Sequence, residues 1–131
     1  MIDVTEKFID SAILKLAIEE ASKSTYTQRI SAIIFKGKRV ASVAHNSVRS
    51  NKIPYKFKNF LESSHAEAHA IIKARRNLKN YDILVVRHNN MGDLLLAKPC
   101  EFCLDFIKYV SIRNVYFSGN TNIIYKLKTY R

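Results

Sequence analysis

Residues 81–88 read YDILVVRH, an apolar, largely β-branched run with its charged side chains near the two ends. A short run of this composition is typical of a strand buried on both faces at the centre of a sheet. Residues 65–78 follow a pair of serines suited to capping a helix, and residues 100–110 place Phe102, Phe106 and Val110 on one helical stripe. The stretch therefore predicts a helix–strand–helix unit around one central strand.

The remaining segments add elements on both sides of this unit. An amphipathic helix is expected from residue 4 to about Lys23, and two β-rich runs around Gly37 predict a hairpin over residues 29–46. Two further strands are expected over residues 113–119 and 123–128, separated by the turn signal GNTN. The predicted order, αββαβαββ, indicates an α/β protein with a mixed sheet.

Length and composition favour one globular domain spanning residues 1–131. A chain of 131 residues with 47% hydrophobic side chains can bury a core without disulfides. We expect no membrane span, because no apolar run is long enough, and no signal peptide, because acids and lysines interrupt the N-terminal segment. The two cysteines, Cys100 and Cys103, are too close in sequence for a disulfide between them to stabilise the fold. Such cysteine usage suits a reducing compartment, so a cytoplasmic protein is expected.

The net charge leaves two interpretations open. The chain has 22 lysines and arginines against 11 acids, a formal charge of +11, and a basic surface attracts the phosphates of nucleic acids. A chain rich in Lys, Asn, Ile and Tyr is also what an AT-rich coding sequence produces. The charge therefore permits a nucleic-acid partner without requiring one.

The pair Cys100 and Cys103 follows Pro99 and has three interpretations when taken alone. It could be a redox pair at a helix N-terminus, half of a zinc site, or two small residues in the core. Catalytic zinc takes three protein ligands, and His65, Cys100 and Cys103 form such a set, with Glu67 as an acid/base group beside it. The two helices that begin with these residues flank one strand, so parallel packing on one sheet face would bring their first turns together.

HAE at 65–67 followed by PCEFC at 99–103 matches the H-x-E…P-C-x-x-C signature of zinc-dependent nucleobase deaminases. The order of the surrounding elements agrees over about residues 1–128, so the chain resembles the cytidine/deoxycytidylate deaminase-like superfamily and small viral and microbial proteins within it. The resemblance implies a three-layer fold, with helices on both faces of a central mixed five-stranded sheet. It also implies Zn²⁺ on His65, Cys100 and Cys103, and Glu67 as the catalytic acid/base.

The resemblance also suggests where substrate binds. Ala66 matches the position whose backbone helps to hold the base, and Asn46 matches an asparagine that contacts substrate in many relatives; the alternative for Asn46 is a turn residue that ends a strand. The basic, aromatic loop that follows Asn46 is a candidate wall of the pocket, or else a solvated loop. Its candidate phosphate or base contacts are Arg49, Lys52 and Tyr55.

The C-terminal part of the chain divides the relatives. The short GNTN connection resembles the branch that acts on free cytidine, whose last two strands form an antiparallel hairpin, but that branch usually has cysteine at the position of His65. The function implied is hydrolytic deamination of a cytosine-containing nucleoside or nucleotide, with release of ammonia. The alternatives are deamination of a base within RNA or DNA, and a catalytically silent protein that binds nucleic acid. Relatives are commonly dimers or tetramers, so a homo-oligomer is expected.

Overall fold

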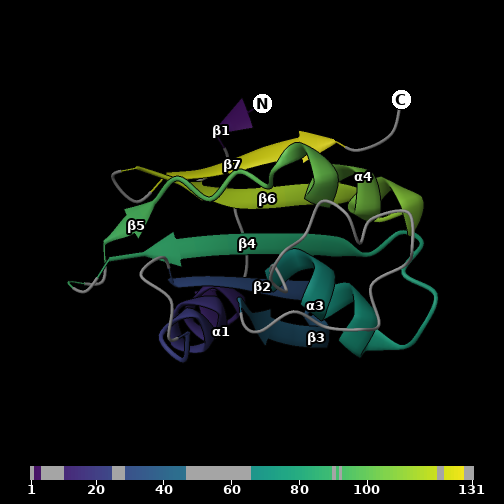
Figure 1. Ribbon diagram of the computed structural model, residues 1–131, viewed down its shortest axis with the longest axis horizontal. Helices are drawn as coiled ribbons and strands as arrows, with labels where there is room; N and C mark the ends of the chain where they lie inside the picture. The colour runs from purple at the N-terminus through teal and green to yellow at the C-terminus, as the bar shows by residue number, and fades with distance from the viewer. Residues whose placement is uncertain are drawn as a thin grey trace.

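The computed structural model describes residues 2–3, 11–24, 29–46, 66–89, 91, 93–120 and 123–128 (Figure 1). The helices in these ranges are α1 (Ser11–Ala21), α3 (Ala66–Ala74) and α4 (Glu101–Tyr109). The strands are β1 (Ile2–Asp3), β2 (Arg29–Lys36), β3 (Arg39–His45), β4 (Asp82–His88), β5 (Leu94–Leu95), β6 (Asn114–Gly119) and β7 (Ile123–Lys128). No described helix is long and apolar enough to cross a bilayer.

All five predicted strands are present and form one mixed sheet in the order β7-β6-β4-β2-β3. The central strand is β4, which runs antiparallel to β2 and parallel to β6. The last two strands, β6 and β7, form the expected antiparallel hairpin across residues 120–122. Two strands of two residues each extend the sheet beyond the prediction: β1 pairs with β7, and β5 pairs with β4.

Helices cover both faces of this sheet, as the resemblance implied. On one face, α3 and α4 pack on alternate residues of the strands, among them Ile34, Ile83 and Phe117. On the other face, α1 packs through Ile13 and Ala17 on the intervening residues, such as Ile33 and Leu84. Figure 1 shows α3 in front of β2 and β3, and α4 in front of β6. The alternation of a strand's side chains thus produces the three layers.

The helix predicted over residues 65–78 is shorter than expected. It ends at Ala74, because Arg75 has a φ of 51° in the left-handed region, which stops helical hydrogen bonding. The hairpin prediction around Gly37 is confirmed, since Gly37 has a φ of +61° in the turn between β2 and β3. The segment 4–10 of the first predicted helix lies outside the described residues.

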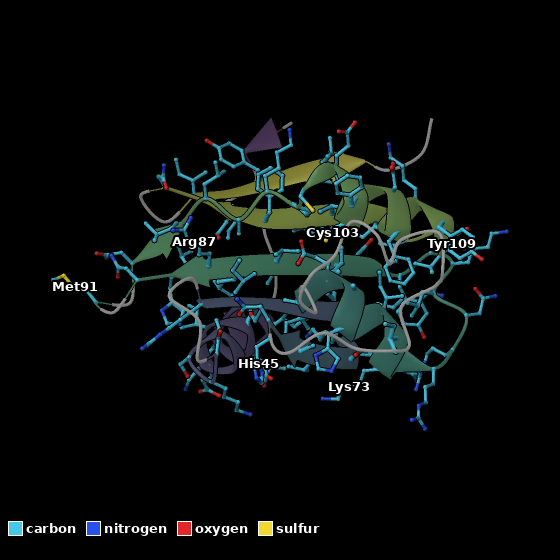
Figure 2. All side chains as sticks on the ribbon, in the orientation of Figure 1. His45, Lys73, Arg87, Met91, Cys103 and Tyr109 are labelled. Carbon is cyan, nitrogen blue, oxygen red and sulfur yellow. The ribbon has the colours of Figure 1, made fainter. Side chains whose placement is uncertain are left out.

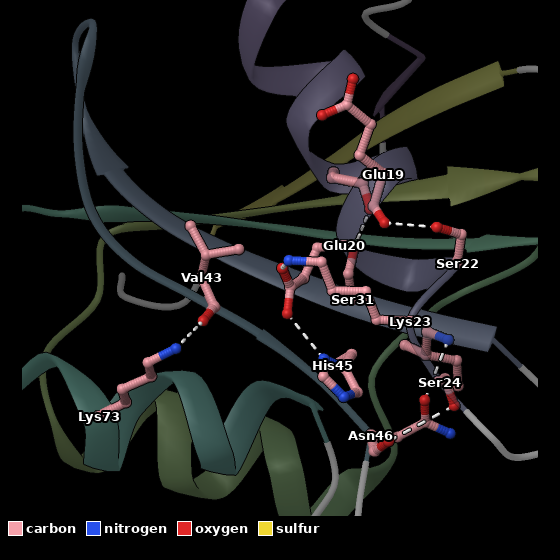
Figure 3. Close-up of polar contacts among 12 residues, drawn as sticks. Glu19, Glu20, Ser22, Lys23, Ser24, Ser31, Val43, His45, Asn46 and Lys73 are labelled. Atoms are coloured by element: carbon pink, nitrogen blue, oxygen red, sulfur yellow. Dashed lines mark hydrogen bonds and ion pairs between the residues drawn. The ribbon is translucent and has the colours of Figure 1, made fainter.

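The end of α1 is joined to the end of β3 by an ion pair. The His45 Nδ1 atom lies 2.7 Å from a carboxylate oxygen of Glu20, and Lys23 contacts the same carboxylate at 3.1 Å (Figure 3). Burial raises the pKa of Glu20, but the hydrogen bonds and positive charges of His45 and Lys23 outweigh burial, so the pKa is lowered overall. The structure thus gives His45 a role in holding α1 against the sheet.

Glu20→Gln is expected to lower the free energy of unfolding by about 1 kcal/mol at pH 7, through loss of this partly buried ion pair. A carboxyl group whose pKa is lowered by folding stabilises the protein above its unfolded pKa of about 4.3, and this contribution is lost as the pH falls through the folded value. The difference in unfolding free energy between wild type and variant should therefore shrink as the pH falls below about 4.3. Urea unfolding of both proteins at pH 7, 5 and 3 measures this difference in the free energy of unfolding.

The matched control is Glu19→Gln, which changes an exposed acid one residue away. This variant should unfold like the wild type at all three pH values. Equal stability of Glu20→Gln and wild type at pH 7 would show that the ion pair contributes nothing.

Candidate active site

The topology brings the first turns of α3 and α4 to the same edge of the sheet. Because β2 is antiparallel to both β3 and β4, β3 and β4 run in the same direction, and β4 is parallel to β6. A helix that connects two strands of the same direction must run back against them, so it begins at their carboxyl edge. Both α3, between β3 and β4, and α4, between β4 and β6, therefore begin at the carboxyl edge of β4.

Three of the predicted site residues lie together at this edge. Glu67, in the first turn of α3, is 5% exposed, and Cys103, in the first turn of α4, is fully buried (Figure 2). Cys100 is the N-cap of α4, with an extended backbone, and is exposed. The Cys103 thiol is hydrogen-bonded to Cys100 and to Glu67. Cys103 and Glu67, which are 36 positions apart in sequence, are thus in contact.

The neighbours of the Cys103 thiol disfavour its ionisation. The pKa of the Cys103 thiol is raised by its hydrogen bond to Cys100, by burial, and by the negative charge of Glu67. A divalent cation in contact with both sulfurs would reverse this effect, because it favours thiolates and neutralises the nearby carboxylate. The two thiols and the neighbouring carboxylate therefore fit the donor chemistry of a catalytic zinc site.

The third predicted zinc ligand, His65, lies outside the described residues, immediately before α3. Within the part of the chain that the structure describes, no group of three or more His, Cys, Asp or Glu side chains is placed to hold a metal ion. The described part of the proposed ligand set is therefore the pair Cys100 and Cys103.

Asn46 follows β3 at the same edge, and hydrogen bonds connect it to Ile30 and Ser24. Its Oδ1 atom accepts a hydrogen bond from the backbone N–H of Ile30 at 3.2 Å, and its own backbone N–H donates to the Ile30 carbonyl at 3.1 Å. The hydroxyl of Ser24 donates to the Asn46 carbonyl at 3.4 Å. Asn46 thus ends the pairing of β2 with β3 at the carboxyl edge of the sheet. This position agrees with the interpretation of Asn46 as a residue that ends a strand.

The other predicted substrate contacts divide into described and undescribed residues. Ala66 is the first residue of α3 and is 1% exposed, so its side chain is packed in the core and only its backbone could meet a ligand. Arg49, Lys52 and Tyr55 lie outside the described residues. His88, expected to have no chemical role, is buried, with its two ring nitrogens at 2.8 Å and 3.2 Å from the carbonyls of Asn89 and Ile18.

One residue at this edge was missed by the sequence interpretation. Arg87 lies next to the end of β4 and is half-buried, and its Nε atom is buried without a hydrogen-bond partner. The available signal was a single cation near the end of the apolar run YDILVVRH. A cation there need not have been functional, because strand ends often carry charge, and only the register shows which face it occupies.

Comparison with known families gives a match over most of the chain. The model described as the cytidine and deoxycytidylate deaminase zinc-binding region matches residues 8–119. This range contains both helices of the candidate site and the intervening strand. No curated protein matches the sequence significantly.

Two solved structures of a dCMP deaminase from the cyanophage S-TIM5 are similar to this chain. The apo form has a TM-score of 0.62 and 19% identity, covering 85% of this chain and 82% of the phage chain. The complex with dCMP and dUMP has a TM-score of 0.62 and 18% identity, covering 83% and 79% of the two chains. At this level of identity the similarity establishes a shared fold, and it agrees with the three-layer architecture.

Proposed function

Because this chain belongs to the cytidine and deoxycytidylate deaminase zinc-binding family, we propose that it is a zinc-dependent hydrolase acting on a cytosine-containing nucleoside or nucleotide. The reaction replaces the exocyclic amine of the base by the oxygen of water and releases ammonia. The observation that carries the proposal is the contact of Glu67 with the Cys103 thiol at the start of two helices. A redox pair or a simple core pair of cysteines would leave that buried carboxylate unexplained.

In this proposal His65, Cys100 and Cys103 hold the zinc ion, which supplies Lewis-acid chemistry when bound. Glu67 takes a proton from the attacking water and passes protons to the ring nitrogen and to the departing amine. Its burial suits this role, because a carboxylate shielded from bulk water exchanges protons with the substrate rather than with solvent. The backbone of Ala66, at a helix N-terminus, and the side chain of Asn46 would hold the base and its sugar.

The substrate class most favoured is the nucleotide, since the similar phage structure contains dCMP and dUMP. A screen for ammonia release over cytidine, deoxycytidine, CMP, dCMP, adenosine, and short RNA and DNA tests the proposal directly. Release from a cytosine compound and formation of the matching uracil product are expected. No release from any substrate by the zinc-loaded protein would contradict the proposal.

A base within RNA or DNA is the second candidate substrate, and the net charge of +11 favours it. If the charge serves this purpose, polynucleotide affinity should fall steeply with added salt, because each neutralised phosphate releases counterions. Deamination of free nucleotides with no activity on RNA or DNA would eliminate this candidate. A cytoplasmic location stays a prediction from the cysteine spacing and the N-terminal segment. A dimeric or tetrameric assembly stays a prediction from the resemblance.

A further inference from the structure

Arg87 belongs to a row of residues that crosses the sheet at the carboxyl edge of β4. Asn46 is hydrogen-bonded to Ile30, and Ile30 is the register partner of Arg87 in the antiparallel β2–β4 pair. We call these three residues the edge row. Neighbouring strands are about 4.8 Å apart, so Asn46 and Arg87 are separated by about 10 Å across the row.

The side chain of Arg87 emerges on the face that carries the candidate site. Side chains alternate along a strand, and Ile83 and Val85 of β4 pack in the cluster beneath α3 and α4, as does the row neighbour Ile30. The next residue along, His88, contacts the Ile18 carbonyl of α1 and so lies on the opposite face. Arg87 therefore shares its face with Glu67 and Cys103, and Figure 2 shows it at the β5 end of β4.

Among the residues that the structure describes, none pairs a carboxylate with the half-buried guanidinium of Arg87. Its Nε atom is buried with no hydrogen-bond partner, and none of the ion pairs among the described residues includes Arg87. An unsatisfied donor in a partly buried site destabilises the protein. By contrast, Arg113 at the other end of the sheet is paired with Asp82 through two nitrogens, at 3.3 Å and 3.2 Å.

The backbone around Arg87 is tied to the segment that leads into Cys100. The Arg87 N–H donates to the Ser118 hydroxyl at 3.1 Å, and that hydroxyl donates to the Leu95 carbonyl at 2.6 Å. The Ser118 carbonyl accepts from the Ala97 N–H at 2.8 Å. These hydrogen bonds fix the position of the end of β4 relative to residues 95–97, which precede α4. A ligand could therefore contact both segments at once.

We propose that Arg87 binds the phosphate group of a nucleoside monophosphate whose base lies at Glu67 and Cys103. The inference rests on the function proposed above and names the residue that would make the site prefer a nucleotide to a nucleoside. A guanidinium pairs with phosphate through two parallel hydrogen bonds, and a phosphate would supply the acceptor that Nε lacks. A base-specific contact is disfavoured, because a cytosine ring has no negative charge to balance the arginine.

The test compares zinc-loaded wild type with Arg87→Gln and Arg87→Lys, using dCMP and deoxycytidine as substrates. The ratio of kcat/KM for dCMP to kcat/KM for deoxycytidine should fall about 10- to 100-fold in Arg87→Gln, the range for loss of a charge-assisted pair. Arg87→Lys keeps the positive charge but cannot form two parallel hydrogen bonds, so its kcat/KM ratio should lie between those of wild type and Arg87→Gln. The matched control is Arg39→Gln, at an exposed position on the opposite edge of the sheet, which should keep the wild-type ratio.

A second measurement separates binding from structure. If Arg87 serves the ligand, Arg87→Gln should melt at the wild-type temperature or higher, because an unpaired charge has been removed. A ratio that stays at the wild-type value, or equal losses on dCMP and deoxycytidine with a lower melting temperature, would overturn the proposal.

Calorimetric titration with dUMP and deoxyuridine tests Arg87 independently of turnover. Should the wild type release no ammonia from any substrate, the proposed function fails, but binding still decides the role of Arg87. Weaker binding of dUMP, relative to deoxyuridine, in Arg87→Gln supports the phosphate contact. Equal affinity of wild type and Arg87→Gln for dUMP overturns it.

Discussion

Glu67→Ala is expected to lower the rate of ammonia release by about 1,000-fold or more while the protein retains its zinc. A positioned acid/base group contributes on the order of 10²- to 10⁴-fold, and Glu67 would act at both the water and the departing amine. Glu67 lies outside the proposed ligand set and alanine is a good helix former, so the variant should keep its fold and its zinc ligands. Initial rates with the best substrate of the screen, together with zinc content by atomic absorption, provide the measurement.

The control for this variant is Glu101→Ala, which removes an exposed acid from the first turn of α4. Its charge lies near the same helix N-terminus but on the surface, and its rate should stay within about twofold of the wild type, as is usual for surface substitutions. A Glu67→Ala protein that keeps a tenth or more of the wild-type rate would remove Glu67 from the mechanism.

Cys103→Ser is expected to abolish zinc binding and with it the stabilisation that the metal provides. A ligand present at about 1,000 times its dissociation constant stabilises a protein by about 4 kcal/mol, so chelation should lower the melting temperature of the wild type markedly. In Cys103→Ser the melting temperature should be low both with and without chelator, because serine is a poor zinc ligand. Zinc content should fall well below one ion per chain.

A buried serine could destabilise the core for reasons unrelated to zinc, and Ala70→Ser controls for this. Ala70 is fully buried in α3, outside the proposed ligand set, so its variant should lose stability yet remain sensitive to chelator. A wild type whose melting temperature does not respond to chelator, or a Cys103→Ser protein with full zinc, would contradict the proposed ligand set.

Local sequence signals were sufficient for most of the framework. The apolar run YDILVVRH is the central strand β4. A strand covered on both faces is apolar at consecutive positions, so its sequence lacks the alternation of polar and apolar residues. Gly37 and the GNTN segment are turn signals in the sequence, and the strands on either side of each pair as predicted hairpins. These features depend on backbone conformation and periodicity, which neighbouring residues determine.

Elements that depend on distant contacts were predicted less well. The strand β5, Leu94–Leu95, is only two residues long and exists because it pairs with the end of β4, so no propensity signal could mark it. The end of α3 at Ala74 was missed, because lysine and arginine favour helix locally while Arg75 adopts a left-handed conformation in the folded protein.

The sequence by itself determined the fold family and the candidate chemistry. The motifs HAE and PCEFC are short, and the residues within each lie close together in the sequence, so both can be recognised without the structure. Only the tertiary structure decided which side chains share a face. The contact of Glu67 with Cys103 requires two crossovers of the same direction. The placement of Arg87 on the same face of the sheet requires the register of β4 against β2. Shifting a strand by one residue turns each side chain to the opposite face, so that information resides in the strand pairing.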